Sequence, residues 1–561
     1  MIRYTYPLKK KMNPKFVRVF PAVALATTFF FAAAKVAAQT PTITAVVNAA
    51  SNIPAGSPNF GIAQGSIFVV YGSNFGPTTL TQPSALPWPT TFAGTSVTVK
   101  QGSNTFNVPI VYVVNNQAGG YSQLGGIMPS ATTPGSATVQ LTYNNVASNA
   151  FSTTIVANGF GISTANESGQ GLAVVTFPTS TAPFYGVVSR ANSAIPGNTY
   201  TIWGTGLGAA TGGNSDTNAS VAGNVGPPIT VLVGGVQAAV TYYGRSPSSG
   251  PGLDQINFTI PQGVSGCFVS LVVETSGTNV SLSNNPSIPI AADGGLCSDP
   301  AGFPTSTWPA LLALPGGINV AAFQMNQAPG FSEIKAIFLS ATQSQVESEY
   351  VQVSEPNVND GPVQVSPGSC VVGFGGPNNT GGTPLDTGST LMVTPPSGSA
   401  LTIPASSTGF YHSTGTTPFP AGTFAVSNGA GGASVGPITT SFTVPAFATW
   451  TNQNVLTNST VTRANGLTVT WSGGSSSAGS YIDISGGSNL PGSNGNSVTF
   501  ECTALASAGT FTIPSSALLA LPAGSGGVAV ASYFFEPITV PGFNLAYATG
   551  SNGANVPITW K

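Results

Sequence analysis

Residues 65–76 read GSIFVVYGSNFG, and residues 197–208 read GNTYTIWGTGLG. Each stretch has an apolar, strand-like run that ends in a glycine-rich turn. Three further stretches follow in the same order in both copies: 96–100, 121–129 and 135–143 in the first, and 229–233, 253–261 and 267–273 in the second. This repeated order indicates a duplicated unit. Each copy spans about 120 to 140 residues of short strands and turns, which is the size of one β-sandwich domain.

The composition of the whole chain agrees with an all-β fold. Of 561 residues, only 5% are charged, whereas 70 are Gly and 46 are Pro. The strong helix formers Glu, Lys and Arg are scarce, so short strands joined by turns are favoured over helices. An apolar fraction of 41% argues against disorder, which combines low hydrophobicity with high net charge.

Alternation along individual strands points to sheets with one buried face. Val97 and Val99 alternate with Thr98 and Lys100, and the pattern predicts antiparallel sheets packed in pairs. The same alternation recurs at 467–472, 498–502 and 510–513, so the C-terminal half is expected to be strand-rich as well. The best helical candidate is short, Ser515 to Leu521 after Pro514.

The amino terminus has the three-part form of a secretory signal. Seven basic residues lie in the first 35 positions, an apolar run follows from Val19 to Ala34, and small residues precede Gln39. We expect cleavage after Ala38, which makes the mature chain secreted, periplasmic or attached to the cell surface, with no membrane span. The alternative is a retained membrane anchor, for which the run is short and interrupted by Pro21.

Removal of the signal leaves six basic and fifteen acidic residues, a formal charge of −9. The six basic residues are scattered: Lys100, Arg190, Arg245, Lys335, Arg463 and Lys561. Binding a phosphate backbone needs clustered Lys and Arg, so nucleic acid is not expected as a partner.

The four cysteines, Cys267, Cys297, Cys370 and Cys502, predict disulfides in an exported chain. Three pairings are possible. We favour Cys267 with Cys297 and Cys370 with Cys502, because the first pair brackets one strand-rich segment and neither has metal-ligand spacing. A zinc site is the alternative, but the chain has no C-x-x-C and a single histidine, His412. Neither a metal nor another cofactor is expected.

The expected organisation has five parts. Residues 1–38 are the signal peptide, 39–157 and 158–296 are the two repeats, and 297–446 and 447–561 are two further β-rich domains divided near Ala446.

The two repeats resemble immunoglobulin-like domains of the IPT/TIG type, on the sequences IAQGSIFVVYGSNFGP and AIPGNTYTIWGTGLGA. The second copy, with ITVLVGGVQAAVTYYG, GLDQINFTIP and SNNPSIPIA, looks like the Solibacter-type C-terminal domain of large secreted acidobacterial proteins. The resemblance covers at most residues 41–292. It implies tandem immunoglobulin-like β-sandwiches and does not imply a catalytic residue. The first copy departs from the pattern at Gly125-Gly126, where the second has Ile256-Asn257.

Asp386 begins the string Asp-Thr-Gly-Ser, which matches the signature of pepsin-like aspartic proteases. That chemistry needs two carboxyl groups that share a proton, and the chain has no second such string. A homodimer could supply two copies, but Pro384 and the prolines after Val393 suit that fold badly. We therefore interpret Asp386 as part of a turn and keep a hydrolase only as a remote alternative.

Two further strings match catalytic or cofactor motifs without their context. Residues 432–436 read GASVG, the nucleophile elbow of serine hydrolases, but Pro437 and a strand follow, and His412 precedes the serine. Residues 204–209 read GTGLGA, a dinucleotide fingerprint, but no helix follows to receive a phosphate. Both are interpreted as tight turns, the second of which needs positive φ at its glycines.

Exposed aromatic side chains could stack on sugar rings. The candidates are Trp88, Trp203, Trp308, Trp450, Trp471 and Trp560. Trp471 is expected in the core, and only Trp88, between two prolines, is typical of a loop aromatic that contacts a ligand.

These observations favour a secreted or cell-envelope scaffold, adhesion or binding protein without catalysis, whose partners are extracellular proteins or glycans. The alternative is an extracellular polysaccharide-binding protein.

Overall fold

The computed structural model describes residues 39–116, 119–181, 185–223, 225–275, 280–299, 303–304, 306–346, 365–374, 382–477, 479–491 and 496–561. The expected signal peptide lies outside these residues. The chain is all-β and consists of immunoglobulin-like sandwiches in tandem. In the described ranges, no helix is long and apolar enough to span a membrane.

The first sandwich packs two sheets face to face. One has the order β1-β3-β8-β7, and the other has the order β2-β11-β9-β5-β4 with β10 beside β9 and β6 beside β5. Their bounds are Thr42–Asn48 (β1), Ile62–Ala63 (β2), Ile67–Ser73 (β3), Thr91–Phe92 (β4), Thr95–Gln101 (β5), Asn104–Asn107 (β6), Ile110–Asn116 (β7), Tyr121–Ile127 (β8), Gly135–Tyr143 (β9), Val146–Ala147 (β10) and Phe151–Val156 (β11). Phe68 and Leu124 from one sheet meet Val97 and Val139 from the other in a dry core.

The second sandwich is one sheet that bends over itself. Its order is β14-β13-β15-β18-β17-β16-β19-β20, with β12 beside β15 and β21 beside β19. The strands are Gly161–Ile162 (β12), Val175–Pro178 (β13), Tyr185–Val187 (β14), Thr199–Thr205 (β15), Ile229–Val233 (β16), Val236–Arg245 (β17), Asp254–Thr259 (β18), Gly266–Thr275 (β19), Ser281–Leu282 (β20) and Ser287–Ile290 (β21). Strand β17 pairs with β16 through its first residues and with β18 through its last, so it passes from one layer to the other.

Corresponding stretches of the two repeats pair in the same way. In each repeat, the first of the four shared stretches pairs with the third: β3 pairs with β8, and β15 pairs with β18. The second pairs with the fourth, as β5 with β9 and as β16 with β19. The two sandwiches therefore share a pairing pattern, as a duplicated unit requires.

The remaining chain forms one long, curved sheet. Among the described residues its order is β24-β35-β34-β37-β38-β22-β23-β28-β27-β26-β29-β30, with β25 beside β23 and β32 beside β38. The strands are Ile318–Ala328 (β22), Phe331–Ala341 (β23), Cys370–Phe374 (β24), Thr383–Pro384 (β25), Thr390–Thr394 (β26), Leu401–Ser407 (β27), Phe410–Gly415 (β28), Gly422–Ser427 (β29), Thr439–Val444 (β30), Thr460–Val461 (β32), Ser480–Asn489 (β34), Ser497–Leu505 (β35), Gly524–Pro537 (β37) and Leu545–Trp560 (β38).

Smaller elements cover this sheet. A three-stranded sheet, Ala448–Trp450 (β31), Leu467–Gly473 (β33) and Thr510–Ile513 (β36), encloses a core that contains Ile484 and Phe500. The helices are Thr307–Leu312 (α1), Gln343–Val346 (α2), Gln453–Leu456 (α3) and Ser515–Leu519 (α4), with 3₁₀ turns Arg463–Asn465 (η2) and Ala506–Ala508 (η3). Leu311 of α1 packs on the sheet face opposite that core.

The expected division near Ala446 does not separate two sheets. Strand β38 pairs with β22, and β24 pairs with β35, so chain from both sides of residue 446 is hydrogen-bonded into one sheet. The 14 residues of β37 and the 16 residues of β38 make this possible, because each is long enough to contribute to two hydrophobic cores.

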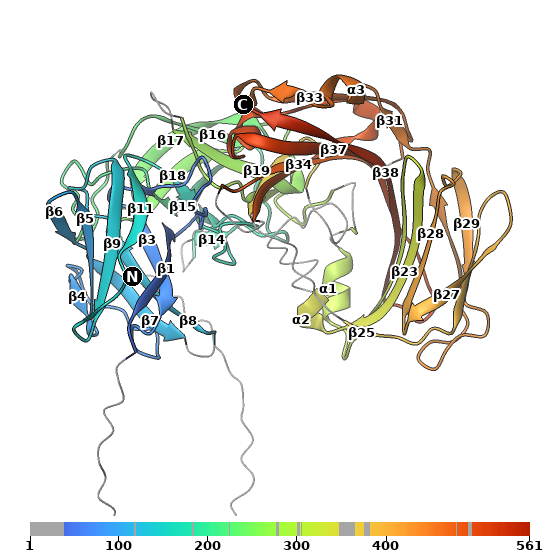
Figure 1. Cartoon of the computed structure of the whole chain (residues 1–561), viewed down its shortest axis with the longest axis horizontal. Helices are drawn as coiled ribbons and strands as arrows, with labels where there is room; N and C mark the ends of the chain where they lie inside the picture. The colour runs from blue at the N-terminus through green and yellow to red at the C-terminus, as the bar shows by residue number, and fades with distance from the viewer. Residues whose placement is uncertain are drawn as a thin grey trace, which may run out of the picture.

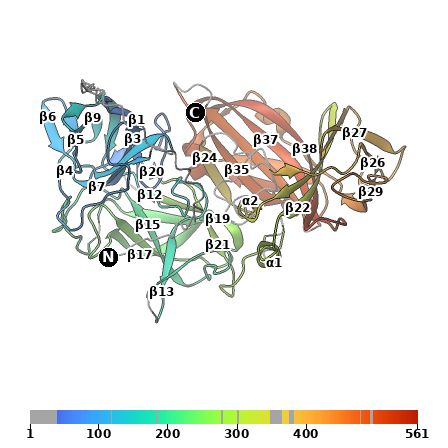
Figure 2. The same ribbon diagram turned by 90° about the horizontal axis from the view of Figure 1, so that it is seen from below.

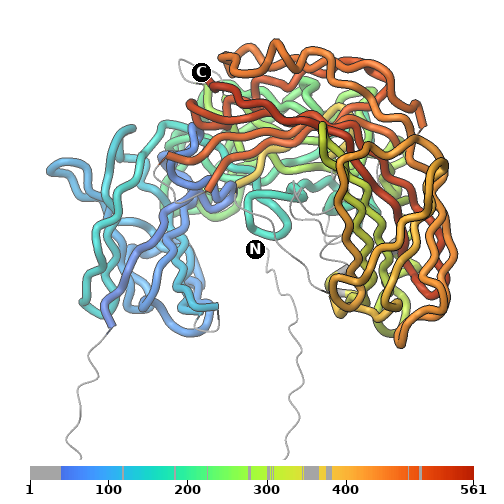
Figure 3. The backbone as a smooth tube through the Cα atoms, turned by 45° about the vertical axis from the view of Figure 1, so that its right-hand side comes forward, coloured from blue at the N-terminus to red at the C-terminus, as the bar shows by residue number. Residues whose placement is uncertain are grey.

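The sandwiches and the long sheet form an arch. Figure 1 shows the first sandwich at one foot, the second sandwich beside the crown, and the long sheet curving down to the other foot, with α1 and α2 beneath it. Seen from below, strands β35, β37, β38 and β22 lie side by side across the crown (Figure 2). The tube in Figure 3 follows the C-terminal strands from the crown into the far foot.

Candidate functional site

The first joint of the arch, between the two sandwiches, is centred on a buried ion pair. Arg245 at the end of β17 contacts Asp254 at the start of β18, and both side chains are at most 1% exposed. The Arg245 guanidinium also donates to the carbonyl oxygens of Gly208, at 2.6 Å, and Gly65, at 3.0 Å. Gly65 belongs to the first sandwich. One side chain therefore crosslinks both sandwiches through backbone groups.

The turn expected at 204–209 forms the other half of this joint. The backbone amides of Gly206 and Leu207 donate to Asp254 Oδ2 at 2.8 and 2.9 Å. Gly206 and Gly208 have φ values of 115° and 146°, which confirms the prediction of a turn that needs positive φ. Two adjacent amides form an anion-binding nest, and here the anion is a carboxylate of the same chain. The glycine pattern that resembles a nucleotide fingerprint thus serves an internal ion pair.

Burial and pairing act in opposite directions on the carboxyl group in this joint. Burial raises the pKa of Asp254, while the charge of Arg245 and the two backbone amides lower it. A buried charge that loses its partner is strongly destabilising, so the joint depends on both side chains.

Further hydrogen bonds hold the same interface. Thr205 Oγ1 donates to the carbonyl of Gly252 at 2.6 Å and accepts from the amide of Ile67 at 2.8 Å. Asn48 Nδ2 donates to the carbonyl of Thr205 at 3.1 Å. Away from this centre, Asp216 accepts from the hydroxyl of Ser130 at 2.6 Å and from its amide at 2.7 Å. Directional contacts on several elements fix the relative orientation of the two sandwiches.

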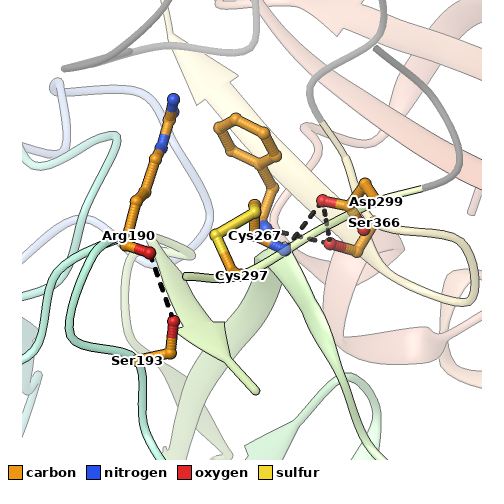
Figure 4. Close-up of a disulfide and its surroundings, with 7 residues drawn as sticks. Arg190, Ser193, Cys267, Cys297, Asp299 and Ser366 are labelled. Atoms are coloured by element: carbon orange, nitrogen blue, oxygen red, sulfur yellow. Dashed lines mark hydrogen bonds between the residues drawn. A yellow bond between two sulfur atoms is a disulfide. The ribbon is translucent and has the colours of Figure 1, made fainter. Parts of the chain in front are cut away.

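The second joint, between the second sandwich and the long sheet, surrounds a disulfide (Figure 4). Asp299 Oδ2 accepts from the amide of Cys267 at 2.7 Å and from the hydroxyl of Ser366 at 3.1 Å. The Arg190 guanidinium lies 4.2 Å from the centre of the Phe268 ring, a cation–π contact. Burial raises the pKa of Asp299 and lowers that of Arg190 to about 10.

Both disulfides lie at this joint, with the pairing that the sequence favoured. Cys267 is bonded to Cys297, and Cys370 to Cys502. Asn285 of the second sandwich donates to the carbonyl of Cys370 at 3.0 Å. Gln170, in the same sandwich, donates to the carbonyl of Phe374 at 3.1 Å. The second sandwich is therefore tied to β24 by hydrogen bonds, and β24 is tied to β35 by a covalent bond.

A line of polar side chains crosses the long sheet on the face opposite its two large cores. Strand register aligns Thr414, Glu333, Asn326, Ser551 and Tyr533, from β28 to β37, and we term these five residues the polar row. Ser551 Oγ donates to Asn326 Oδ1 at 3.2 Å. Residues in register on adjacent strands project from the same face, so the five side chains form one continuous line, whose inner end at Tyr533 packs against the core that contains Leu311.

Charged groups flank the polar row at its outer end. Glu333 Oε1 lies 2.9 Å from Lys335 Nζ and 2.9 Å from His412 Nε2, and the Lys335 and His412 side chains are about two-fifths exposed, at 40% and 43%. Partial burial acts to raise the pKa of Glu333, but the hydrogen bonds and charge of Lys335 and the contact with His412 outweigh it, so the pKa lies below its ordinary value. This end of the row offers both donors and acceptors to solvent.

The hydrolase-like strings come together without forming a triad. The backbone carbonyl of Asp386 accepts from the amides of Ser434 and Val435, while its side chain accepts from the amide of Gly388 at 2.9 Å. Asp386 thus forms the turn that its sequence predicts. His412 points to Glu333 on the polar face, while its neighbour Tyr411 is in the core, so strand alternation directs the imidazole away from Ser434.

The tryptophans are mostly held by their indole N–H groups. Trp471 donates to the carbonyl of Ala506 and is 5% exposed, which confirms its predicted burial. Trp203, Trp450 and Trp560 also donate to protein oxygens. The backbone of Trp308 lies in α1. Trp88 is half-buried, its ring lies against Gly250 of the second sandwich, and its Nε1 has no hydrogen-bond partner among the described residues. Its role in ligand contact remains a prediction.

Sequence reasoning missed the two ion-pair partners of the first joint. One signal was present: Asp254 shares the phase of Ile256 and Phe258, which are in the core. A charged residue at a core position of an alternating strand predicts a buried charge with a partner. Register alone could not identify Arg245 as that partner.

Comparisons with known proteins give only weak similarities to solved structures. No family model matches the chain, and no curated protein matches it. Among solved structures, it is similar to the I-band fragment I67-I69 from titin, with 8% identity over 66% of this chain and 95% of that chain, at a TM-score of 0.12. It is also similar to tandem Ig repeats of Dlar, with 10% identity over 45% and 99% of the two chains, at a TM-score of 0.12. A third is the Bacteroides ovatus mixed-linkage glucan utilization locus protein SGBP-B in complex with a heptasaccharide, with 10% identity over 75% and 88%, at a TM-score of 0.11.

Proposed function

We propose that the chain is an exported binding or adhesion scaffold of the cell envelope or extracellular space, without catalytic activity of its own. Its two joints carry this proposal. Each is built from buried, directional contacts, centred on Arg245 and Asp254 in one case and on Asp299 and a disulfide in the other. Such contacts preorganise a large surface, so a partner is bound without the entropic cost of ordering the sandwiches. The sequence of the second copy resembles the Solibacter-type domain of secreted proteins, and this resemblance supports the export of the chain.

A binding screen with purified residues 39–561 tests the proposal. We expect retention on an extracellular protein or polysaccharide fraction, and no turnover of peptide or glycoside substrates. Hydrolysis that disappears in Asp386→Asn, with the binding of the substrate retained, would replace the scaffold by an enzyme. Asn keeps the oxygen that accepts from the amide of Gly388, so this variant separates chemistry from turn structure.

Polysaccharide is the second candidate partner, and the polar row favours it. The row presents hydroxyl, amide and carboxylate groups in register, which are the groups that hydrogen-bond sugar hydroxyls. Asn326→Ala and Glu333→Ala should each reduce retention on the polysaccharide that the intact chain binds. Thr402→Ala, at an exposed position of β27, is the control and should leave retention unchanged. Loss on Trp88→Ala alone would place the glycan at the first joint instead.

A further inference from the structure

Three oxygen-bearing side chains meet on two neighbouring strands near the crown of the arch. Asp483 on β34 lies directly opposite Thr503 on β35, and Glu501 lies two residues before Thr503. The intervening residues, Ile482 and Phe500 among them, face the core on the other side of the sheet. The three polar side chains therefore project from one face within cross-strand distance of each other.

One oxygen atom of each of these three side chains has no hydrogen-bond partner among the described residues. Asp483 Oδ1, Glu501 Oε2 and Thr503 Oγ1 are each sealed from solvent and without a partner. A buried polar atom without a partner destabilises the folded state, and more so when it is charged. Thr503 adds a third oxygen that does not depend on charge. Its neutral hydroxyl is 0% exposed and lies on the same face as the two carboxyl groups. A bound cation would supply the partner that each of these three oxygen atoms lacks.

Among the described residues, no basic side chain is paired with either of these two carboxyl groups. Arg245 pairs with Asp254, Lys335 pairs with Glu333, and Arg463 donates to backbone carbonyls. Arg190 lies at the second joint, Lys100 is in β5 of the first sandwich, and Lys561 ends the chain on β38. Burial raises the pKa of Asp483 to about 7 and that of Glu501 well above its ordinary value, and the charge of Asp483 raises the latter further.

We propose that Asp483, Glu501 and Thr503 bind a divalent metal cation of the calcium class. Their donors are all oxygen, which hard cations prefer over transition metals that favour nitrogen and sulfur. Two carboxylates match the charge of one divalent ion. Ca²⁺ accepts six to eight ligands with flexible geometry, so water would have to complete the shell around these three side chains. Asp483 is partly exposed as a residue although its Oδ1 is buried, so an ion would reach the three oxygen atoms from the side of Asp483.

Calorimetric titration of chelator-treated residues 39–561 with CaCl₂ tests this proposal, with thermal unfolding as a second measurement. We expect one saturable site and a higher unfolding temperature with Ca²⁺, because an ion that binds only the folded state stabilises it. Asp483→Asn and Glu501→Gln should each raise the Kd for Ca²⁺ more than about tenfold. Glu333→Gln removes a carboxylate from the same sheet face and should leave the Kd unchanged.

A variant that keeps both carboxyl groups guards against misfolding. Thr503→Val replaces the hydroxyl by a methyl group of similar volume and should weaken Ca²⁺ binding in a protein with an unchanged circular dichroism spectrum. Absence of a calcium-dependent response in the intact chain overturns the proposal. So does a Kd for Ca²⁺ that is the same in Asp483→Asn or Thr503→Val as in the intact chain.

Discussion

At the scale of single residues, replacing Arg245 should lower the free energy of unfolding more than replacing an exposed cation does. Its side chain is 1% exposed and pairs with the fully buried Asp254. Arg245→Met leaves that carboxylate buried and unpaired, and we expect a loss of about 3 to 5 kcal/mol in the free energy of unfolding. Lys335→Met, at an ion pair whose cation is 40% exposed, should cost less than about 1 kcal/mol. Denaturant unfolding followed by tryptophan fluorescence measures both.

The double variant Arg245→Met, Asp254→Leu isolates the cause of that loss. With both charges removed, no carboxylate is left unpaired, so part of the stability should return. If the double variant is as unstable as the sum of the two single variants, the ion pair is not the source of the effect.

Asp299 should make the second joint sensitive to pH. Burial raises its pKa in the folded state above the ordinary value of 3.8. The folded state then holds a proton more tightly than the unfolded state, so this contribution to stability is full below pH 3.8 and is lost as pH rises through the raised pKa. Asp299→Asn cannot titrate. We expect the unfolding temperature of the intact chain to fall relative to the variant from pH 4 toward neutrality, as measured by calorimetry, whereas parallel curves would contradict the assignment.

At the scale of elements, the two disulfides should differ in their contribution. The Cys370–Cys502 bond closes a separation of 132 residues, and the Cys267–Cys297 bond one of 30. Chain entropy gives about 5 kcal/mol for the longer loop and about 3.6 kcal/mol for the shorter. Replacing Cys370 and Cys502 by serines should therefore lower the unfolding temperature more than replacing Cys267 and Cys297 by serines. Equal or reversed losses in calorimetry would show that local contacts outweigh loop length.

Individual strands could be predicted because alternation depends only on neighbouring residues. The predicted strand at 96–100 lies within β5, the pattern at 467–472 lies within β33, and the predicted helix at 515–521 begins at Ser515 as α4. The disulfide pairing also followed from local spacing and is found in the structure. The strands and the helix depend on information contained in a short stretch of chain, whereas the Cys370–Cys502 pair joins residues 132 positions apart.

Contacts that depend on the second face of a sheet could not be predicted in this way. Glu501 alternates with Phe500 and Cys502, so the pattern assigns it to solvent, yet it is 4% exposed. The face it occupies is covered as well, and alternation reports only which residues face the larger core. The same limit explains why the predicted division near Ala446 does not separate two sheets. The pairing between β22 and β38 joins residues more than 200 positions apart, which a local pattern does not report.

At the scale of the whole molecule, the joints explain how a chain of small sandwiches keeps one shape. Interfaces between domains of one chain normally permit relative motion unless they are large or specifically bonded. Here the first joint buries an ion pair, and the second is crossed by hydrogen bonds from Asn285 and Gln170 to β24, with one disulfide on each side of it. These contacts hold the long sheet, which carries the polar row, in place relative to the first two sandwiches.

Small-angle X-ray scattering of residues 39–561 tests this rigidity most directly. Buried contacts are screened little by salt, so the arch should give a single pair-distance distribution that stays the same from low salt to about 1 M. A profile that only a mixture of open and closed arrangements can reproduce, or that expands as salt increases, would contradict the account.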